Sequence, residues 1–178
     1  MEEKKYKLTE ESISYNGKTL YRIESVRDFS NNFSEVKKGQ KGGFIESEYN
    51  LSHEGDALVY GNASVYDNAM VSGNACVCDN AWVFGNANVS GKALVSGNAK
   101  VSGDAKVCAD EDYIVFKNWW SSLRCFTWTR SNNMWKVGCF FGTGEELIAK
   151  AYKDSELSGR EYERVVKYVE SIINEDRI

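Results

Sequence analysis

The chain offers few side chains that could do catalytic chemistry, and the first of them is its single histidine, His53. A histidine can act as a general base because its pKa lies near neutral pH. The sequence has no GxSxG, HExxH or P-loop pattern that would indicate hydrolysis, zinc proteolysis or phosphate binding by a glycine-rich loop. Cys76 and Cys78 form a CxC without a second pair at metal-ligand spacing. We therefore expect no metal and no cofactor.

A second group of candidate residues is aromatic and basic, and it lies in the stretch DYIVFKNWWSSLRCFTWTRSNNMWKVGCFFGTGEEL. Such side chains dominate protein-binding hot spots, and they can also stack on a base and pair with phosphate. A C-terminal domain of this size needs tryptophans for its core too, and we expect at least half of them there. The predicted ligand or partner site consists of Trp119, Trp120, Arg124, Trp128, Arg130 and Trp135.

Charge and hydropathy narrow the classes of partner. The 178 residues include 22 basic and 26 acidic ones, and the net charge of −4 disfavours direct binding to nucleic acid. No apolar run approaches the roughly 20 residues that span a bilayer, and MEEKKYKLTEES lacks the apolar segment of a signal peptide. Five irregularly spaced cysteines suit reduced thiols. These features predict a cytoplasmic protein without a membrane partner.

The elements that must position these residues are dominated by a repeat, V-x-[GD]-N-A-x, which runs through eight full hexads from Val59 to Lys106. A strict short period indicates a repeat architecture. The alternation A-x-V-x is typical of a short strand with Ala and Val on one face. The Gly-Asn or Asp-Asn pair suits a corner, because both residue types tolerate positive φ. Three hexads would close a triangular turn of 18 residues, with the valines inside.

This pattern resembles the hexapeptide repeat of left-handed parallel β-helices. Upstream, Ile45, Leu51 and Ala57 continue the six-residue spacing and suggest a first, irregular turn, so the helix should have about four turns. The resemblance also implies a homo-oligomer, most often a trimer, with a dimer as the rival. In hexapeptide acyltransferases a histidine activates the acceptor of acetyl-CoA. Counting back from Val59 places His53 in the inward valine register, where we expect a capping or hydrogen-bonding role instead of catalysis.

Residues 18 apart should stack in columns on the outside of the triangle. The first face then carries Leu58, Tyr60, Cys76 and Cys78, the second face carries Tyr66, Trp82 and Phe84, and the third face is mostly polar. Apolar patches of this size need a cover. The cover could be the terminal segments of the chain, a neighbouring subunit or a ligand. The predicted oligomer interface consists of Leu58, Tyr60, Tyr66, Trp82 and Phe84.

The two flanks complete a mainly β fold of three parts: residues 1–40 as a hairpin and cap, 41–110 as the β-helix, and 111–178 as a small α+β domain. Asn16-Gly17 between alternating residues predicts a hairpin with a type I′ turn. In the C-terminal part we expect strands at 113–117, 125–130 and 135–140. Capping boxes at Thr143–Glu146 and Ser158–Glu161 should each open a helix.

Over nearly its full length the chain resembles a phage and prophage family labelled putative transferases or polymer-forming proteins. The segments that carry the likeness are YKLTEESISYNGKTLYRIE, GGFIESEYNLS, the AxVxGN repeats and FTWTRSNNMWKVGCFFGTGEEL. The resemblance implies a non-enzymatic binding protein that sequesters or inhibits a host defence protein or a nucleotide signal. The alternatives are a hexapeptide acyltransferase using acetyl-CoA and a purely structural polymer-forming protein.

Overall fold

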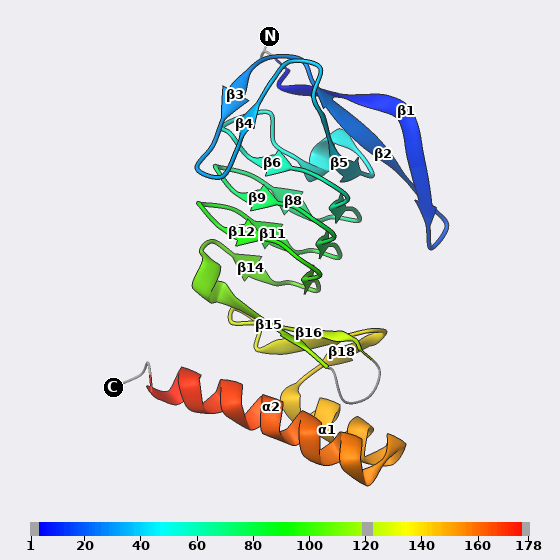
Figure 1. Cartoon of the computed structure of the whole chain (residues 1–178), viewed down its shortest axis with the longest axis vertical. Helices are drawn as coiled ribbons and strands as arrows, with labels where there is room; N and C mark the ends of the chain where they lie inside the picture. Colours follow the sequence, from blue (N-terminus) through cyan, green and yellow to red (C-terminus); the bar gives the residue numbers. More distant parts are fainter. Residues whose placement is uncertain (1–3, 119–122, 176–178) are drawn as a thin grey trace.

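The computed structural model describes residues 4–118 and 123–175, and its central element is a left-handed β-helix of about four turns. The turns stack along the long axis of the molecule, between an N-terminal hairpin and a C-terminal sheet with two helices (Figure 1). Three two-residue strands make up each regular turn. They are β6 (Leu58–Val59), β7 (Ser64–Val65), β8 (Met70–Val71), β9 (Cys76–Val77), β10 (Trp82–Val83), β11 (Asn88–Val89), β12 (Leu94–Val95), β13 (Lys100–Val101) and β14 (Lys106–Val107).

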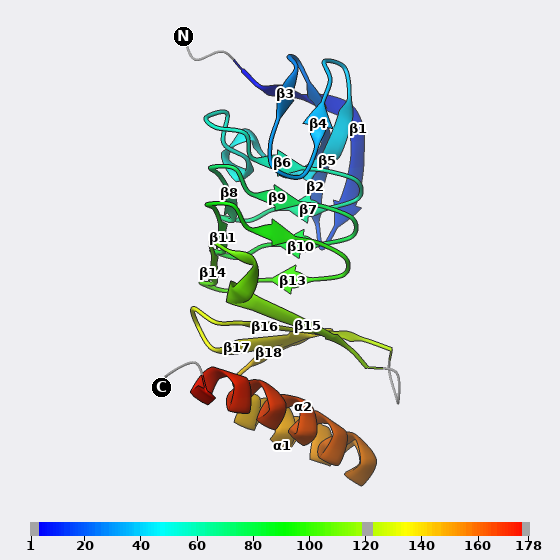
Figure 2. The same ribbon diagram turned by 60° about the vertical axis from the view of Figure 1, so that its left-hand side comes forward.

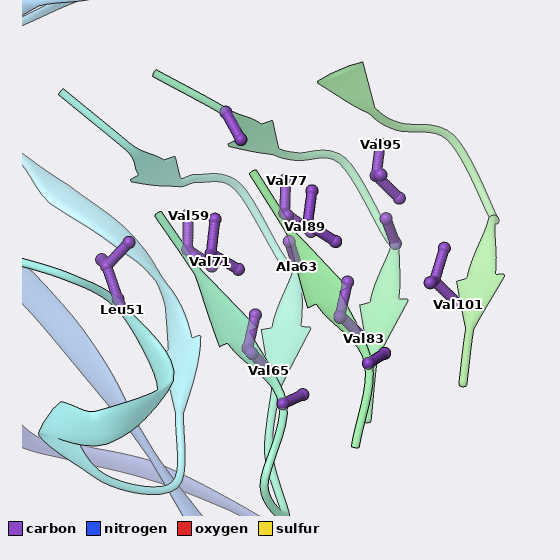
Figure 3. Packing of buried hydrophobic residues seen from close by; sticks show 14 of the residues in the cluster. Leu51, Val59, Ala63, Val65, Val71, Val77, Val83, Val89, Val95 and Val101 are labelled. Carbon is purple, nitrogen blue, oxygen red and sulfur yellow. The ribbon is translucent and has the colours of Figure 1, made fainter. Parts of the chain in front are cut away.

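Strands 18 residues apart pair in parallel, which confirms the period predicted from three hexads. The first face joins β6, β9 and β12, the second joins β7, β10 and β13, and the third joins β8, β11 and β14. The repeat valines from Val59 to Val107 are fully buried, and those from Val59 to Val101 are seen to point inward in Figure 3. The repeat alanines fill the remaining interior with exposed fractions of 0–1%. A narrow core of stiff, branched side chains therefore fixes the register of every turn.

The corners fall on the predicted Gly-Asn and Asp-Asn pairs, and the structure shows which residue of each pair is left-handed. The left-handed conformation falls on the first residue of each Gly-Asn or Asp-Asn pair, such as Asp67 at φ 60° and Gly85 at φ 71°, and not on the asparagine. Glycine is favoured there for a second reason, since a Cβ on Gly85 would lie 3.0 Å from the backbone nitrogen of Gly103. At one corner the asparagines of successive turns are hydrogen-bonded to each other, since Asn68 Nδ2 donates to Asn86 Oδ1 at 3.1 Å.

The first turn is irregular, as predicted, but the register predicted for it was wrong. Ile45 of β5 (Lys41–Ile45) pairs with Val65, and Leu51 after the 3-10 helix η1 (Glu48–Asn50) bridges to Val71. These partners are 20 residues apart, so two extra residues lie between Leu51 and Val59. His53 lies within this longer corner and not in the inward valine register. The prediction failed because Ala57, which is buried at the alanine position before Val59, also lies six residues after Leu51 and so resembles the next valine position.

The N-terminal segment extends the second face into a six-stranded sheet. Strands β1 (Tyr6–Tyr15) and β2 (Lys18–Ser25) form the predicted hairpin, with Asn16 at φ 49° and Gly17 at φ 77° as in a type I′ turn. β2 pairs with β5, which pairs with β7, so the hairpin runs along the side of the β-helix (Figures 1 and 2). A short second hairpin follows, made of β3 (Phe29–Ser30) and β4 (Glu35–Val36).

The two ends of the β-helix are capped with opposite chemistry. Backbone N–H groups of each turn donate to carbonyl groups of the next turn, as from Leu58 to Ala75 at 2.9 Å, so the first turn exposes acceptors and the last exposes donors. Side-chain donors therefore cover the N-terminal end, including Lys5, Tyr6, Arg22, Asn31 and Asn50. Side-chain acceptors cover the C-terminal end: Asp110 for Leu94, Thr127 for Lys100 and Ser131 for Lys106.

Lys5 is the most costly of these caps, and it supplies a prediction about pH. Its side chain is fully buried, its Nζ donates to the carbonyl of Ala57 at 2.7 Å, and burial lowers its pKa from 10.5 to about 8, opposed in part by Asp56. Below pH 8 the lysine is charged in both the folded and unfolded states, and the folded state bears the full desolvation cost. Between about pH 8 and 10.5 the folded state loses the proton first, so stability rises.

We expect the unfolding free energy of the wild type to increase by about 3 kcal/mol relative to Lys5→Met between pH 7.5 and 10.5, at about 1.4 kcal/mol per pH unit of pKa difference. Urea titrations of both proteins at several pH values measure this difference, and all other titrating groups cancel from it. A difference that stays constant across this range would show that the Lys5 amine is not desolvated.

The C-terminal part packs one face of a sheet on the last turn and the other face on two helices (Figures 1 and 2). It has four strands and not the three predicted, because the turn at Gly138 divides the last segment. α1 (Gly144–Asp154) opens at the predicted capping box of Thr143. Ser158 does not cap a helix as predicted, because it lies inside α2 (Glu156–Glu175), where its N–H donates to Ser155 Oγ. The elements are η2 (Asp110–Asp112), β15 (Tyr113–Lys117), β16 (Cys125–Thr129), β17 (Met134–Val137), β18 (Phe140–Gly142), α1 (Gly144–Asp154) and α2 (Glu156–Glu175).

Candidate functional site

The second face of the β-helix carries a column of aromatic side chains that the 18-residue period aligns. Trp82 pairs with Ser64 on one side and Lys100 on the other. Two residues after Ser64 and Trp82, the rings of Tyr66 and Phe84 stack on each other. Their centroids are 5.1 Å apart and the angle between their planes is 1°. The column was predicted from the sequence. Its surroundings depend on how the two flanking parts of the chain dock against it.

The N-terminal hairpin covers the upper part of this column. Leu20, Phe44 and Tyr66 form a buried cluster, and burial raises the pKa of the Tyr66 hydroxyl. The Tyr15 ring meets Trp82 edge to face at 4.3 Å. Trp82 and Phe84 themselves are only half-buried. One of the predicted covers, the chain's own N-terminal segment, is thus present, and it stops short of the lower rings.

The first face is covered in the same way by the second hairpin. Val36 packs on Leu58 and Cys76, which are each 3% exposed, while Tyr60 is 39% exposed at the edge. Among the five residues predicted to form an oligomer interface, Leu58 and Tyr66 are therefore covered within the single chain. Tyr60, Trp82 and Phe84 retain exposed surface, and their place in an interface stays a prediction.

Three parts of the chain meet around the lower rings of the second face and leave a cleft of about 230 Å³. We call this hollow the aromatic cleft. The hairpin contributes Tyr15 and Asn16, strand β17 contributes Lys136, and the turn between β17 and β18 contributes Gly138 and Cys139. The β-helix supplies its floor with Tyr66, Trp82, Phe84 and Lys100.

Two lysines lie on the rings of this cleft. Lys100 Nζ lies 5.5 Å from the Trp82 ring centroid, and Lys136 Nζ lies 5.5 Å from that of Phe84. Desolvation lowers the pKa of Lys136, and the neighbouring charge of Lys100 lowers it further. Within the described residues neither lysine forms an ion pair with a carboxylate, and no carboxylate lines the cleft. The cleft therefore holds two neighbouring cations, of which Lys136 is partly desolvated, and an anion would stabilise both.

The predicted C-terminal site divides into core and surface. Trp128 and Trp135 are each 2% exposed, within the cluster that joins the sheet to α1 and α2, so they serve the core and not the surface that was expected. Trp128 Nε1 donates to Asn133 Oδ1 at 2.9 Å, which satisfies the buried indole. Trp119 and Trp120 lie outside the described residues.

The two predicted arginines are exposed, and they flank the two ends of β16 in the C-terminal sheet. The side chain of Arg124 lies beside Gly138, close to the aromatic cleft. Arg130 lies at the opposite end of β16, where its Nε donates to the carbonyl of Glu111 at 3.2 Å. The structure therefore brings only Arg124 near the lysines.

His53 has a structural role in this arrangement. Its ring stacks on Tyr6 with centroids 4.3 Å apart, and its Nδ1 accepts the backbone N–H of Lys5 at 3.2 Å. Its Nε2 lies 3.9 Å from Glu48 Oε2. These contacts tie the first β-strand to the longer corner and make His53 part of the N-terminal cap, as predicted. The histidine lies at the opposite end of the β-helix from the lysines of the aromatic cleft.

Cys76 and Cys78 are poorly placed to act as nucleophiles. Burial raises the pKa of the Cys76 thiol to about 12 and raises that of Cys78 in the same direction, so both disfavour the thiolate. Among the described residues, no group of three histidine, cysteine or carboxylate side chains is placed to hold a metal ion. In the same part of the chain, no helix has the length and apolar character needed to cross a bilayer.

Sequence reasoning missed Tyr15, Asn16, Lys136 and Cys139, because docking alone brings them to the column. Lys100 did carry a signal, since it follows Trp82 at the 18-residue spacing. Comparison with known proteins adds no identity to this geometry: no protein-family model and no curated protein matches the chain.

Proposed function

We propose that the protein is a non-enzymatic binding protein, which holds a small anionic ligand with a planar ring, namely a nucleotide, in the aromatic cleft. The observation that carries this proposal is the pair Lys100 and Lys136, which lie on half-buried aromatic rings in a cleft whose described lining has no carboxylate. Stacking of a base on an aromatic ring stabilises a complex by about 1–3 kcal/mol. Charge-assisted hydrogen bonds from lysine to phosphate add about 1.5–3 kcal/mol each.

The resemblance to phage proteins supports a biological role for such binding. A protein that sequesters a nucleotide signal would counter a host defence without any chemical step. The second form of this role, inhibition of a host protein, has less support, because two of the four tryptophans proposed for that surface are buried. A cytoplasmic location in the infected or lysogenic cell fits both forms.

The acyltransferase alternative is disfavoured by the position of His53. A general base must reach the proton that it removes, within about 3 Å. Here the ring stacks on Tyr6 and its Nδ1 is engaged by the Lys5 backbone. A polymer that grows end to end is disfavoured as well, since side chains cap both ends of the β-helix. We expect assembly to be lateral, as a homotrimer or a dimer.

Cys139 offers a direct test of ligand binding, because its exposed thiol lines the aromatic cleft. Cys108 is also exposed but lies past β14 on the third face, and it serves as the internal control. We expect saturating ATP or UTP to slow alkylation of Cys139 about tenfold and to leave the rate at Cys108 unchanged. Mass spectrometry of peptides reports each thiol separately. Equal alkylation of Cys139 with and without every nucleotide tried would refute the proposed function.

A further inference from the structure

A second hollow of about 290 Å³ adjoins the aromatic cleft and shares Lys100 and Gly138 with it. We call it the basic hollow. It lies between the last turn of the β-helix and the paired ends of β15 and β16. Its lining consists of Asn98, Lys100, Lys117, Leu123, Arg124, Cys125 and Gly138.

The chemistry of the basic hollow differs from that of the cleft. Three cations line it, and the described lining includes neither a carboxylate nor an aromatic ring. In the part of the chain that the structure describes, Lys100, Lys117 and Arg124 form no ion pair with a carboxylate. The chain as a whole carries a charge of −4, so the four cations that line the two adjoining hollows are a local concentration of positive charge. Lys136 lines the aromatic cleft, Lys100 lines both hollows, and Lys117 and Arg124 line the basic hollow.

We propose that the ligand is a mononucleotide with two or more phosphate groups, which places its base in the aromatic cleft and its phosphate chain across Lys100 in the basic hollow. This inference rests on the proposed function and specifies its ligand class. Lys117 and Arg124 then bind the outer phosphates, and the guanidinium of Arg124 can pair with phosphate oxygens in a bidentate manner.

The described aromatic rings are confined to the aromatic cleft, while cations line both hollows, and this arrangement distinguishes the proposed ligand from related ones. A dinucleotide would place its second base in the basic hollow, where the described lining offers no ring on which it could stack. A single-stranded nucleic acid needs a series of stacking positions along a groove, and the described lining of the two hollows holds one group of rings. A nucleoside monophosphate would leave Lys117 and Arg124 without an anion. The geometry therefore favours one base and an extended chain of phosphates.

The test is calorimetric titration of the full chain with AMP, ADP and ATP, and with the matching uridine series, at constant ionic strength and without divalent cations. We expect the dissociation constant to fall about tenfold with each added phosphate. Equal affinity for AMP and ATP, within twofold, would overturn this inference while leaving the proposed function standing. Absence of binding for all six nucleotides would remove both. Tighter binding of diadenosine tetraphosphate than of ATP would also contradict a one-base ligand.

A double variant, Lys117→Gln with Arg124→Gln, isolates the basic hollow. It should lower the affinity for ATP to that of AMP, about a hundredfold, and should change the affinity for AMP by less than twofold. The matched control is Lys92→Gln with Lys106→Gln, which removes the same charge from exposed positions outside both hollows. A loss of equal size for AMP and ATP in the first variant, or for ATP in the control, would show that the net charge alone attracts the ligand.

Discussion

The Val83→Asp variant is expected to unfold under conditions in which the wild type is stable. Val83 is fully buried between Val65 and Val101, and the repeat valines and alanines around it have no polar atom in their side chains. A carboxylate there has no partner, and placing it there costs on the order of 5 kcal/mol or forces the group to bind a proton. That cost is comparable with the whole unfolding free energy of a typical domain, about 5–15 kcal/mol.

Urea denaturation followed by circular dichroism measures the effect, with two companion variants. Asn88→Asp introduces the same charge at an outward position one hexad further on, and we expect it to change stability by less than about 0.5 kcal/mol. Val83→Ala removes apolar volume without charge and should cost about 2 kcal/mol, so it remains measurable if the aspartate variant fails to fold. A Val83→Asp protein that unfolds at the wild-type urea concentration would contradict the inward register.

Reversing both charges in the aromatic cleft, as Lys100→Glu with Lys136→Glu, should weaken nucleotide binding about a thousandfold, which corresponds to about 4 kcal/mol. The variant replaces two attractive contacts with two repulsive ones beside the same rings. Titration with ATP measures the loss. A reduction of less than tenfold would mean that the phosphates bind elsewhere.

The same lysines distinguish a binding role from a structural one. Burial and the proximity of Lys100 both lower the pKa of Lys136, so its charge destabilises the empty protein. We therefore expect Lys136→Met to unfold at a temperature equal to or above that of the wild type while it loses affinity for ATP. A lysine that served only to hold the two parts together would show the reverse, a lower unfolding temperature.

Much of the β-helix could be predicted from the sequence because its period is short and its core is uniform. Every Val from 59 to 107 repeats the same environment, so one turn specifies the next. The prediction failed where the period breaks. The two residues added between Leu51 and Val59 are hidden by Ala57, which fits either register, and this error placed His53 at a valine position when it lies in the longer corner.

The candidate site could be predicted only in part, for a different physical reason. Trp82 and Phe84 follow from the 18-residue columns, but the position of Lys136 depends on how a separate sheet packs on the last turn. Composition also does not distinguish a core tryptophan from a surface one. Trp128 and Trp135 lie opposite each other on β16 and β17 and pack in the cluster that includes residues of α1 and α2. Their burial follows from the pairing of these two strands, and the aromatic content of the segment alone does not determine that pairing.

Because the two ends of the β-helix carry opposite caps, the helix can change its length by whole turns without rotating the parts attached to its ends. Every interior turn donates to the next turn and accepts from the one before, so an inserted 18-residue turn leaves both caps with their partners and moves the C-terminal sheet by about 4.8 Å along the axis. An inserted hexad instead rotates that sheet by a third of a turn. Lys136 would then face a different side of the triangle from Trp82. Evolution can thus change the height of such a cleft in whole turns, but any other insertion separates its walls.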